Sequence, residues 1–508
     1  MTIWRLLILL CVAFQVAAQQ GTLQYTVSAP KASDHYFHVA LHADGWAVDS
    51  LTLKMPRWTP GYYQLLNYAN QVERVVAKDM HGKDLLVRKA NDNTWKVAVG
   101  KVKTVTISYD VKAEKKFVAQ PYVDTEHAYL IAAGLFLSVE GNLHAAASVK
   151  LDLNPSWKIA TGLIPITGRK NEYSAPDFDI LFDCPILAGP LEELPAFKVQ
   201  GAEHRFIGFQ LGTFDRVRFM KNLEKVTASA ISIIGDIPFN QYTFLAIGPG
   251  RGGIEHLNNT TVSFSGDGLD EPEAMNRMMN FLAHEYFHHY NVKRIRPFEL
   301  GPFDYDKGSR TNLLWVSEGI SVYYEYLIVK RAGLADEGKL LANFEGNINT
   351  HENNPGRLHQ SLTQASYKTW SDGPFGKSGE DANKSISYYE KGPIAGMFLD
   401  FAIRQATQNQ RSLDDVMRSV YWKYYKNLKR GFTDAEFQQA CEEVAGVSLS
   451  PVFDFVYTTK ELDYDTYLGY AGLKISSQQT DKGKKYLIQR VDNPNKLQSS
   501  ILKAWLGD

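Results

Sequence analysis

Two histidines stand four positions apart in the segment His284-Glu285-Tyr286-Phe287-His288. One turn of an α-helix places residues with this spacing on the same face, where both rings can bind one metal ion. The carboxylate of Glu285 would then lie beside the open coordination position, where it can act as a general base on a water molecule. The spacing predicts a hydrolytic zinc site with His284 and His288 as ligands.

The sequence around this motif favours a real site. With 13 histidines in 508 residues, the pattern would occur by chance in about 2 of 100 such chains. Residues 273–283 contain no glycine or proline, and Pro272 follows two acidic residues suited to a helix start. The motif is therefore expected late in a helix. The neighbouring His289 would point about 100° away from the shared face and is interpreted as structural.

A catalytic zinc ion normally takes three protein ligands, and Glu318 is the strongest candidate for the third. It lies in the apolar stretch 313–324, which is long enough for a second buried helix. A single carboxylate among large hydrophobic side chains needs a partner that offsets its desolvation. Zinc would be that partner; alternatively, Glu318 faces solvent or pairs with the basic residues of segment 293–296.

Secondary-structure patterns divide the chain into regions. Residues 19–195 alternate short apolar runs with turn signals and predict an antiparallel β-sandwich-like domain. Residues 196–330 combine a few strands with the two metal helices in a catalytic domain. Residues 331–465 are mostly helical, as in 412–426 and 433–444. Residues 466–508 predict a short strand and a helix. The clearest strand patterns are 24–27, 36–43, 50–55, 94–99, 104–109 and 146–153.

Composition and the N-terminus indicate an exported protein. Lys plus Arg (55) balance Asp plus Glu (56), so no global field recruits nucleic acid. Residues 1–18 have the features of a secretory signal peptide, with Arg5, an apolar run and small residues before Gln19. We expect a periplasmic or extracellular protein without a membrane span in the mature chain, although an uncleaved anchor is the alternative. Cys184 and Cys441 then remain, and buried unpaired thiols are slightly favoured over a disulfide.

Three weaker patterns also bear on chemistry. Gly252 and Gly253 follow a strand-like run, so their backbone could approach a ligand closely, and the carboxylate of Glu255 could bind a substrate ammonium. The segment 388–392, Tyr-Tyr-Glu-Lys-Gly, leads into a helix and offers a phenol that could donate to an oxyanion. The Pro-Gly turn in segment 57–63 is more typical of a packing corner than of a binding site.

Taken in order, these segments resemble the glycyl aminopeptidase family of zinc metallopeptidases, of the gluzincin type with Glu as third ligand. The resemblance rests on residues 284–297, 315–319, 252–256, 388–392 and 58–62, and it spans most of 25–470. It implies an α+β multidomain protein: an N-terminal β domain, a thermolysin-like zinc catalytic domain and a helical C-terminal domain. Many members also carry a PDZ domain, but only about 40 residues follow Leu468, too few for a complete one.

By this resemblance, His284, His288 and Glu318 would be the zinc ligands and Glu285 the general base. Glu255 would hold the free amine of a peptide substrate, and Tyr389, with Tyr388 as its rival, would stabilise the transition state. The expected activity is release of N-terminal Gly or Ala. A zinc endopeptidase of the same class and a secreted binding protein with an inactive zinc site remain the alternatives.

Overall fold

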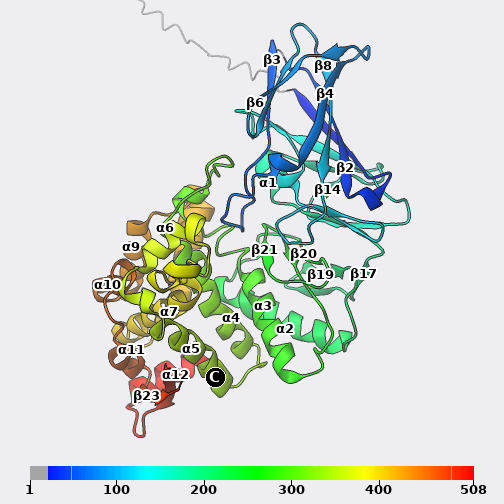
Figure 1. Ribbon diagram of the computed structural model, residues 1–508. Coiled ribbons are helices and arrows are strands. Elements are labelled where there is room, and N and C mark those ends of the chain that lie inside the picture. Colours follow the sequence, from blue (N-terminus) through cyan, green and yellow to red (C-terminus); the bar gives the residue numbers. More distant parts are fainter. Residues whose placement is uncertain (1–20, 47, 482) are drawn as a thin grey trace, which may run out of the picture.

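The computed structural model describes residues 21–508 apart from residues 47 and 482. The expected signal peptide, residues 1–18, lies outside the described part. Figure 1 shows a β-rich N-terminal region, a central region of mixed sheet and helices, and a helical C-terminal region beside it. The predicted multidomain α+β fold is confirmed.

The N-terminal region is built around one large sheet. Its strands in spatial order are β14 (Ile164–Pro165), β15 (Glu172–Ala175), β12 (Ala147–Asp152), β1 (Thr22–Ser28), β2 (Tyr36–Asp44), β8 (Thr104–Lys112), β4 (Val72–Asp79) and β5 (Asp84–Leu85). Two smaller sheets complete it: β13 (Lys158–Thr161), β16 (Ile186–Gly189), β10 (Ala128–Leu130) and β9 (Tyr122–Val123); and β11 (Ser138–Val139), β3 (Ser50–Lys54), β7 (Thr94–Ala98) and β6 (Val87–Asn91).

Alternating burial along β2 and β8 explains why these segments form strands: apolar side chains point into the core and polar ones point outward. One pairing departs from the expected antiparallel pattern, because β1 and β12 run parallel. The chain between β8 and β12 passes through other sheets before it returns to the free edge of β1. A connection of this length permits a parallel pairing that a tight hairpin cannot make.

The central region contains a second sheet and the first metal helix. Its strand order is β17 (Glu192–Glu193), β19 (Ala202–Gly208), β20 (Gln241–Ala246), β22 (Asn259–Val262) and β21 (Gly253–Glu255), and β18 (Phe197–Val199) also pairs with β19. The helices are α2 (Arg216–Ile234), which the sequence analysis did not foresee, and α3 (Pro272–Phe287). Strand β21 forms the sheet edge next to α3, so a ligand can reach both.

The helical region packs directly on this centre. It comprises α4 (Ile320–Arg331), α5 (Glu337–Glu352), α6 (Leu362–Asp372), α7 (Tyr388–Ala406), α8 (Leu413–Val420), α9 (Asp434–Ala445), α10 (Ser450–Tyr457) and α11 (Tyr464–Tyr470). The tail forms a hairpin of β23 (Leu473–Thr480) and β24 (Gly483–Arg490), followed by α12 (Lys496–Leu506). One hydrophobic core joins the central and helical regions, whereas the β region has its own.

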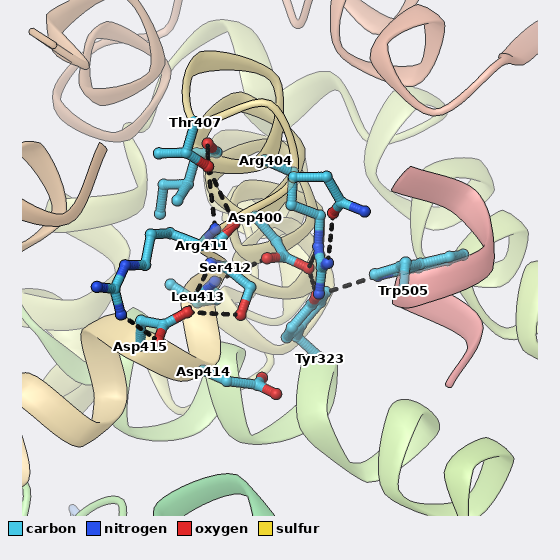
Figure 2. Close-up of polar contacts among 12 residues, drawn as sticks. Tyr323, Asp400, Arg404, Thr407, Arg411, Ser412, Leu413, Asp414, Asp415 and Trp505 are labelled. Carbon is cyan, nitrogen blue, oxygen red and sulfur yellow. Dashed lines mark hydrogen bonds and ion pairs between the residues drawn. The ribbon is translucent and has the colours of Figure 1, made fainter. Parts of the chain in front are cut away.

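A buried polar network ties α7 to α4, α8 and α12 (Figure 2). Asp400 Oδ2 accepts from the Tyr323 hydroxyl at 2.7 Å and from Arg404 Nε at 3.0 Å, and its Oδ1 accepts from the Leu413 amide at 2.7 Å. The indole of Trp505 donates to the same tyrosine hydroxyl at 3.0 Å. The C-terminal helix is thereby fixed to α4.

Replacing Asp400 with Asn should destabilise the protein by about 3–5 kcal/mol, because Arg404 would remain buried without a counter-charge. The shift of the urea unfolding curve, followed by tryptophan fluorescence, measures this cost. The matched control is Asp454→Asn, which breaks only the exposed pair with Lys460 and should cost less than about 1 kcal/mol. Equal shifts for both variants would contradict a stabilising role of the network.

Two other expectations concern the cysteines and the membrane. Cys184 and Cys441 are both buried and unpaired, so the expectation of free thiols is confirmed. Within the described chain, no helix combines the length and the apolar character needed to cross a bilayer.

Candidate active site

Helix α3 brings the two motif histidines together at its end. His284 lies in the last turn and His288 is the C-cap residue, and both side chains are buried. Their Nε2 atoms are 2.9 Å apart. Glu318 Oε2 lies 3.2 Å from His288 Nε2 and 3.5 Å from His284 Nε2. The three ligand atoms thus all lie within 4.8 Å of one another.

The outer nitrogen of each ring is already engaged. His288 Nδ1 lies 2.7 Å from the carbonyl oxygen of Asn291, and His284 Nδ1 lies 2.9 Å from Glu325 Oε2. A ring that donates from Nδ1 offers Nε2 as an acceptor, so two acceptor nitrogens and a carboxylate oxygen face one another. Facing acceptor atoms repel one another unless a cation lies between them. Two His with one Glu form a ligand set of catalytic zinc. The residues therefore fit a metal ion.

The pKa shifts of the clustered side chains also favour a bound cation. Burial alone would lower the pKa of His284, but the carboxylates of Glu318 and Glu325 raise it well above its usual value. Burial alone would also raise the pKa of Glu318, yet the His288 and His284 rings hold it below its usual range. This buried pocket therefore favours positive charge between the imidazoles and the carboxylate.

Glu325, the carboxylate beside the outer nitrogen of the His284 ring, was not expected from the sequence. It lies on α4 seven residues after Glu318, about two helical turns further along the same side. This second acid in an otherwise apolar helix was the available signal. Carboxylates that hold the far side of a ligating His fix its tautomer and orientation.

Glu318 itself lies in a π-helical turn, Trp315–Gly319, that precedes α4, and not in the regular helix that the apolar run predicts. Such single π turns are frequent at functional sites because they shift side chains from their regular helical positions. The side-chain Nδ2 of Asn291 donates to the backbone carbonyl of Val316 at 2.8 Å and to that of Ser317 at 3.2 Å. Asn291 thus joins the end of α3 to the turn that carries Glu318.

Two glycines let α7 approach this turn. A Cβ atom on Gly319 would lie 2.6 Å from the Cα of Gly392, and the reverse holds for Gly392. Any side chain at either position would push the two backbones apart. The glycines that follow Glu318 and Lys391 in the sequence therefore allow the close packing that brings α7 beside the metal cluster.

The Glu285 carboxylate lies beside the cluster and against β21. Thr260 Oγ1 donates to its Oε2 at 3.3 Å, and a Cβ on Gly253 would come within 2.4 Å of the carboxylate. Burial raises the pKa of Glu285 to about 7. This value suits a group that must take up and release a proton near neutral pH.

Glu255 is the last residue of β21, and its side chain is buried. Its Oε1 has no hydrogen-bond partner among the described residues, and a Cβ on Gly61 would lie 2.7 Å from its Oε2. Burial raises the pKa of Glu255, and the nearby His288 ring partly offsets this. A buried carboxylate oxygen without a partner can accept a hydrogen bond from a ligand donor.

The two adjacent tyrosines at the start of α7 have different neighbours. The Tyr389 hydroxyl donates to Glu318 Oε2 at 2.9 Å, whereas the Tyr388 hydroxyl lies 3.1 Å from Thr369 Oγ1. The structure thus brings Tyr389, and not its rival, to the metal cluster. Burial raises the pKa of Tyr63 well above its usual value, and the Glu255 and Glu318 carboxylates add to this, which places a further phenol near the site.

A cavity of about 500 Å³ opens beside the cluster, and His284, Glu285 and Tyr389 line it. Its walls include Tyr63 and Gln64 from the β region, Gly253 from β21, and residues of α3, α4 and α7. The prediction that segment 57–63 forms a packing corner holds only for its first part, since Trp58 is fully buried and its indole donates to the Asp304 carbonyl at 2.7 Å. The turn at Gly61 then directs the following residues into the cavity.

The remaining candidates near the motif are structural. Lys293 Nζ lies 2.5 Å from Asp183 Oδ1, and Arg294 donates to the carbonyls of Leu257 and His289 at 2.8 and 2.6 Å. His289 is fully buried among aromatic rings, which include Tyr286 and Tyr290. The basic run therefore does not pair with Glu318.

Comparisons with protein families agree with this arrangement. Residues 24–190 match the Peptidase M61 N-terminal domain, and residues 277–395 match the M61 glycyl aminopeptidase domain. The two matches together cover more than half of the chain. A search of the curated protein sequences gives no match.

Solved structures show the same fold. An aminopeptidase N family protein from Idiomarina loihiensis superimposes with a TM-score of 0.85 at 27% identity, over 90% of this chain and 79% of that one. An M1 zinc metallopeptidase from Deinococcus radiodurans gives a TM-score of 0.54 at 14% identity, over 88% of this chain and 94% of that one. A mutant of that enzyme with the substrate Tyr-Ser-Ala gives 0.53 at 14% identity, over 88% and 95%.

Proposed function

The chain belongs to the M61 glycyl aminopeptidase family, and we propose that it is a zinc-dependent aminopeptidase that releases small residues from peptides with a free N-terminus. The observation that carries this proposal is the convergence of His284, His288 and Glu318 next to a cavity that His284 and Glu285 line. Two imidazoles and a carboxylate provide the ligands, and a separate carboxylate provides the base.

In the proposed reaction, Glu285 accepts a proton from the attacking water and passes it to the leaving amine. A zinc ion held by the three ligands would supply Lewis acidity to the water and the scissile carbonyl. The Tyr389 hydroxyl turns from Glu318 to donate to the oxyanion that forms on the carbonyl. Glu255 accepts hydrogen bonds from the substrate ammonium, and the free edge of β21 can pair with the extended peptide backbone.

The preference for Gly or Ala is part of this proposal. The backbone of Gly61 lies against the Glu255 carboxylate, where a Cβ atom would come within 2.7 Å of Oε2, so little space remains on that side for a first side chain. The family description, glycyl aminopeptidase, supports Gly as the first residue. The mutant M1 zinc metallopeptidase from Deinococcus radiodurans, which has a similar fold, was solved with the short peptide Tyr-Ser-Ala as its substrate.

Metal analysis combined with turnover of free and N-acetylated aminoacyl substrates tests the function. We expect about one zinc ion per chain and hydrolysis that requires the free amine. Hydrolysis of blocked peptides at the same rate would instead indicate an endopeptidase. A zinc-loaded protein that hydrolyses none of the substrates would indicate a binding protein.

Removal of the Glu255 carboxylate should weaken the use of free-amine substrates. We expect Glu255→Ala to lower kcat/KM for Ala-p-nitroanilide by about 10- to 100-fold, because a charge-assisted hydrogen bond to the ammonium is lost. The control Glu224→Ala removes an exposed carboxylate from α2 and should change little. An equal loss on N-acetylated peptides would contradict an anchor for the amine.

Removal of the Tyr389 hydroxyl should slow the chemical step. We expect Tyr389→Phe to lower kcat by about 100-fold with little change in KM, because an oxyanion donor acts chiefly in the transition state. Tyr388→Phe is the matched control, since its hydroxyl lies against Thr369. The role would pass to Tyr63 if Tyr63→Phe lowered kcat more than Tyr389→Phe.

We also propose that the protein is exported. The support is the signal-peptide pattern of residues 1–18. Mass spectrometry of the mature protein should find Gln19 as its first residue, and an N-terminus at Met1 would contradict cleavage.

A further inference from the structure

One side of the cavity is formed by a single face of α3. Arg277, Asn280, Phe281 and His284 all line the cavity, and their spacing of three, four and seven residues places them along one face of the helix. His284 lies at the metal cluster, whereas Arg277 lies two turns nearer the start of α3. At 1.5 Å per residue, the two positions are about 10 Å apart along the helix.

The Glu255 carboxylate lies toward the opposite end of this face. Gly253, where β21 begins, lies against Glu285. Arg294, in contrast, donates both to the carbonyl of Leu257, beyond the end of β21, and to that of His289. Glu255, between these two points of the chain, therefore lies toward the end of α3 and away from Arg277. If the substrate ammonium binds at Glu255, as the proposed function requires, the rest of the peptide leaves along α3 toward Arg277. The peptide direction therefore follows from the position of the amine.

Asn280 offers a polar contact on this path. Its side chain is more than nine-tenths buried and lines the cavity, and its Oδ1 has no hydrogen-bond partner among the described residues. An unpaired buried acceptor of this kind costs stability unless a ligand supplies a donor. The amide N–H groups of a peptide are such donors.

Arg277 differs in charge from the rest of the cavity. It is the only Arg or Lys among the described lining residues, whereas Glu285, Glu325 and Glu390 contribute carboxylates. No ion pair or hydrogen bond of its exposed side chain is found in the described part of the chain. A guanidinium binds a carboxylate through two parallel hydrogen bonds, which makes it a suitable recognition group for a peptide C-terminus.

We propose that Arg277 binds the C-terminal carboxylate of short peptide substrates, so that the enzyme acts on oligopeptides and not on the N-termini of proteins. An extended peptide advances about 3.3 Å per residue, so 10 Å corresponds to about three residues beyond the scissile bond. The best substrates are therefore about four residues long. In a shorter or longer peptide, the free C-terminus would not reach Arg277, and the carboxylates that line the cavity would repel it.

The role of Arg277 is tested by measuring peptide binding to the zinc-loaded Glu285→Gln variant by calorimetry, because this variant does not turn the peptide over. The probes are Ala-Gly-Gly-Gly with a free carboxylate and its C-terminal amide. We expect the free acid to bind about 10- to 100-fold more tightly, and Arg277→Gln in the same background to abolish this difference. Arg88→Gln, an exposed arginine of β6 outside the cavity, is the control and should retain it.

The failures of this inference and of the proposed function are distinguishable. Equal affinity for the acid and the amide, or a preference that survives Arg277→Gln, would overturn the role of Arg277 and leave the aminopeptidase intact. Failure of both peptides to bind, together with no turnover of Ala-p-nitroanilide by the unaltered enzyme, would overturn the proposed function itself. Turnover of the unaltered enzyme on Ala-Gly dipeptide through hexapeptide acids should also peak near the tetrapeptide.

Discussion

Glu285→Gln is expected to retain its metal ion and to lower kcat by about 10³-fold. The amide cannot accept a proton from water, so proton transfer to and from the reacting groups is lost. The fold should be unchanged, because the amide oxygen can still accept the hydrogen bond from Thr260 and the side chain keeps its volume beside Gly253. Steady-state kinetics on Ala-p-nitroanilide and metal analysis by mass spectrometry measure the two properties separately.

The control for this variant lies on the same helix. Glu273 is an exposed residue in the first turn of α3 that pairs with Lys339, and Glu273→Gln should leave kcat within about twofold. Turnover of Glu285→Gln comparable to that of Glu273→Gln would remove Glu285 from the role of general base. A loss of metal from Glu285→Gln would instead show that this carboxylate belongs to the ligand set.

Glu318→Gln is expected to weaken zinc binding by at least about 10³-fold. Loss of a carboxylate that orients a ligating histidine typically costs about 10- to 100-fold in metal affinity, and loss of a direct ligand should exceed this range. The amide would also leave the two histidines without the charge that now draws a cation between them. Competition with a chelator of known affinity gives the change in dissociation constant.

Glu325→Gln provides a graded comparison. This residue contacts only the outer nitrogen of His284, so its replacement should weaken zinc binding by about 10- to 100-fold, less than Glu318→Gln does. The expected order of affinity is the unaltered protein, then Glu325→Gln, then Glu318→Gln. If Glu318→Gln bound zinc as tightly as the unaltered protein, the third ligand would have to be another residue.

The sequence predicted much of the secondary structure because local patterns were strong. The runs 36–43 and 104–109 alternate apolar and polar residues and form β2 and β8, and Pro272 marks the start of α3. The helix α2 and the strand β23 were not foreseen. β23 is mostly polar and partly exposed, so it carries no clear pattern of alternating burial.

The order of strands could not be read from the sequence. The parallel pairing of β1 with β12 joins segments more than 100 residues apart. Similarly, the Asp400 network joins helices whose residues are separated by up to 182 positions along the chain. Such contacts depend on how whole elements pack, and no local spacing specifies them.

The sequence by itself determined the chemistry of the motif: one helical turn fixes the side-by-side placement of His284 and His288, and a buried acid in an apolar run has to find a partner. Only the tertiary structure decided that this partner is the histidine pair, that the phenol of Tyr389 reaches it, and that a turn of the β region lines the cavity. The reason is physical. Spacing within a helix follows from backbone geometry, whereas the meeting of α3, α4 and α7 depends on long-range packing, including the close backbone contact at Gly319 and Gly392.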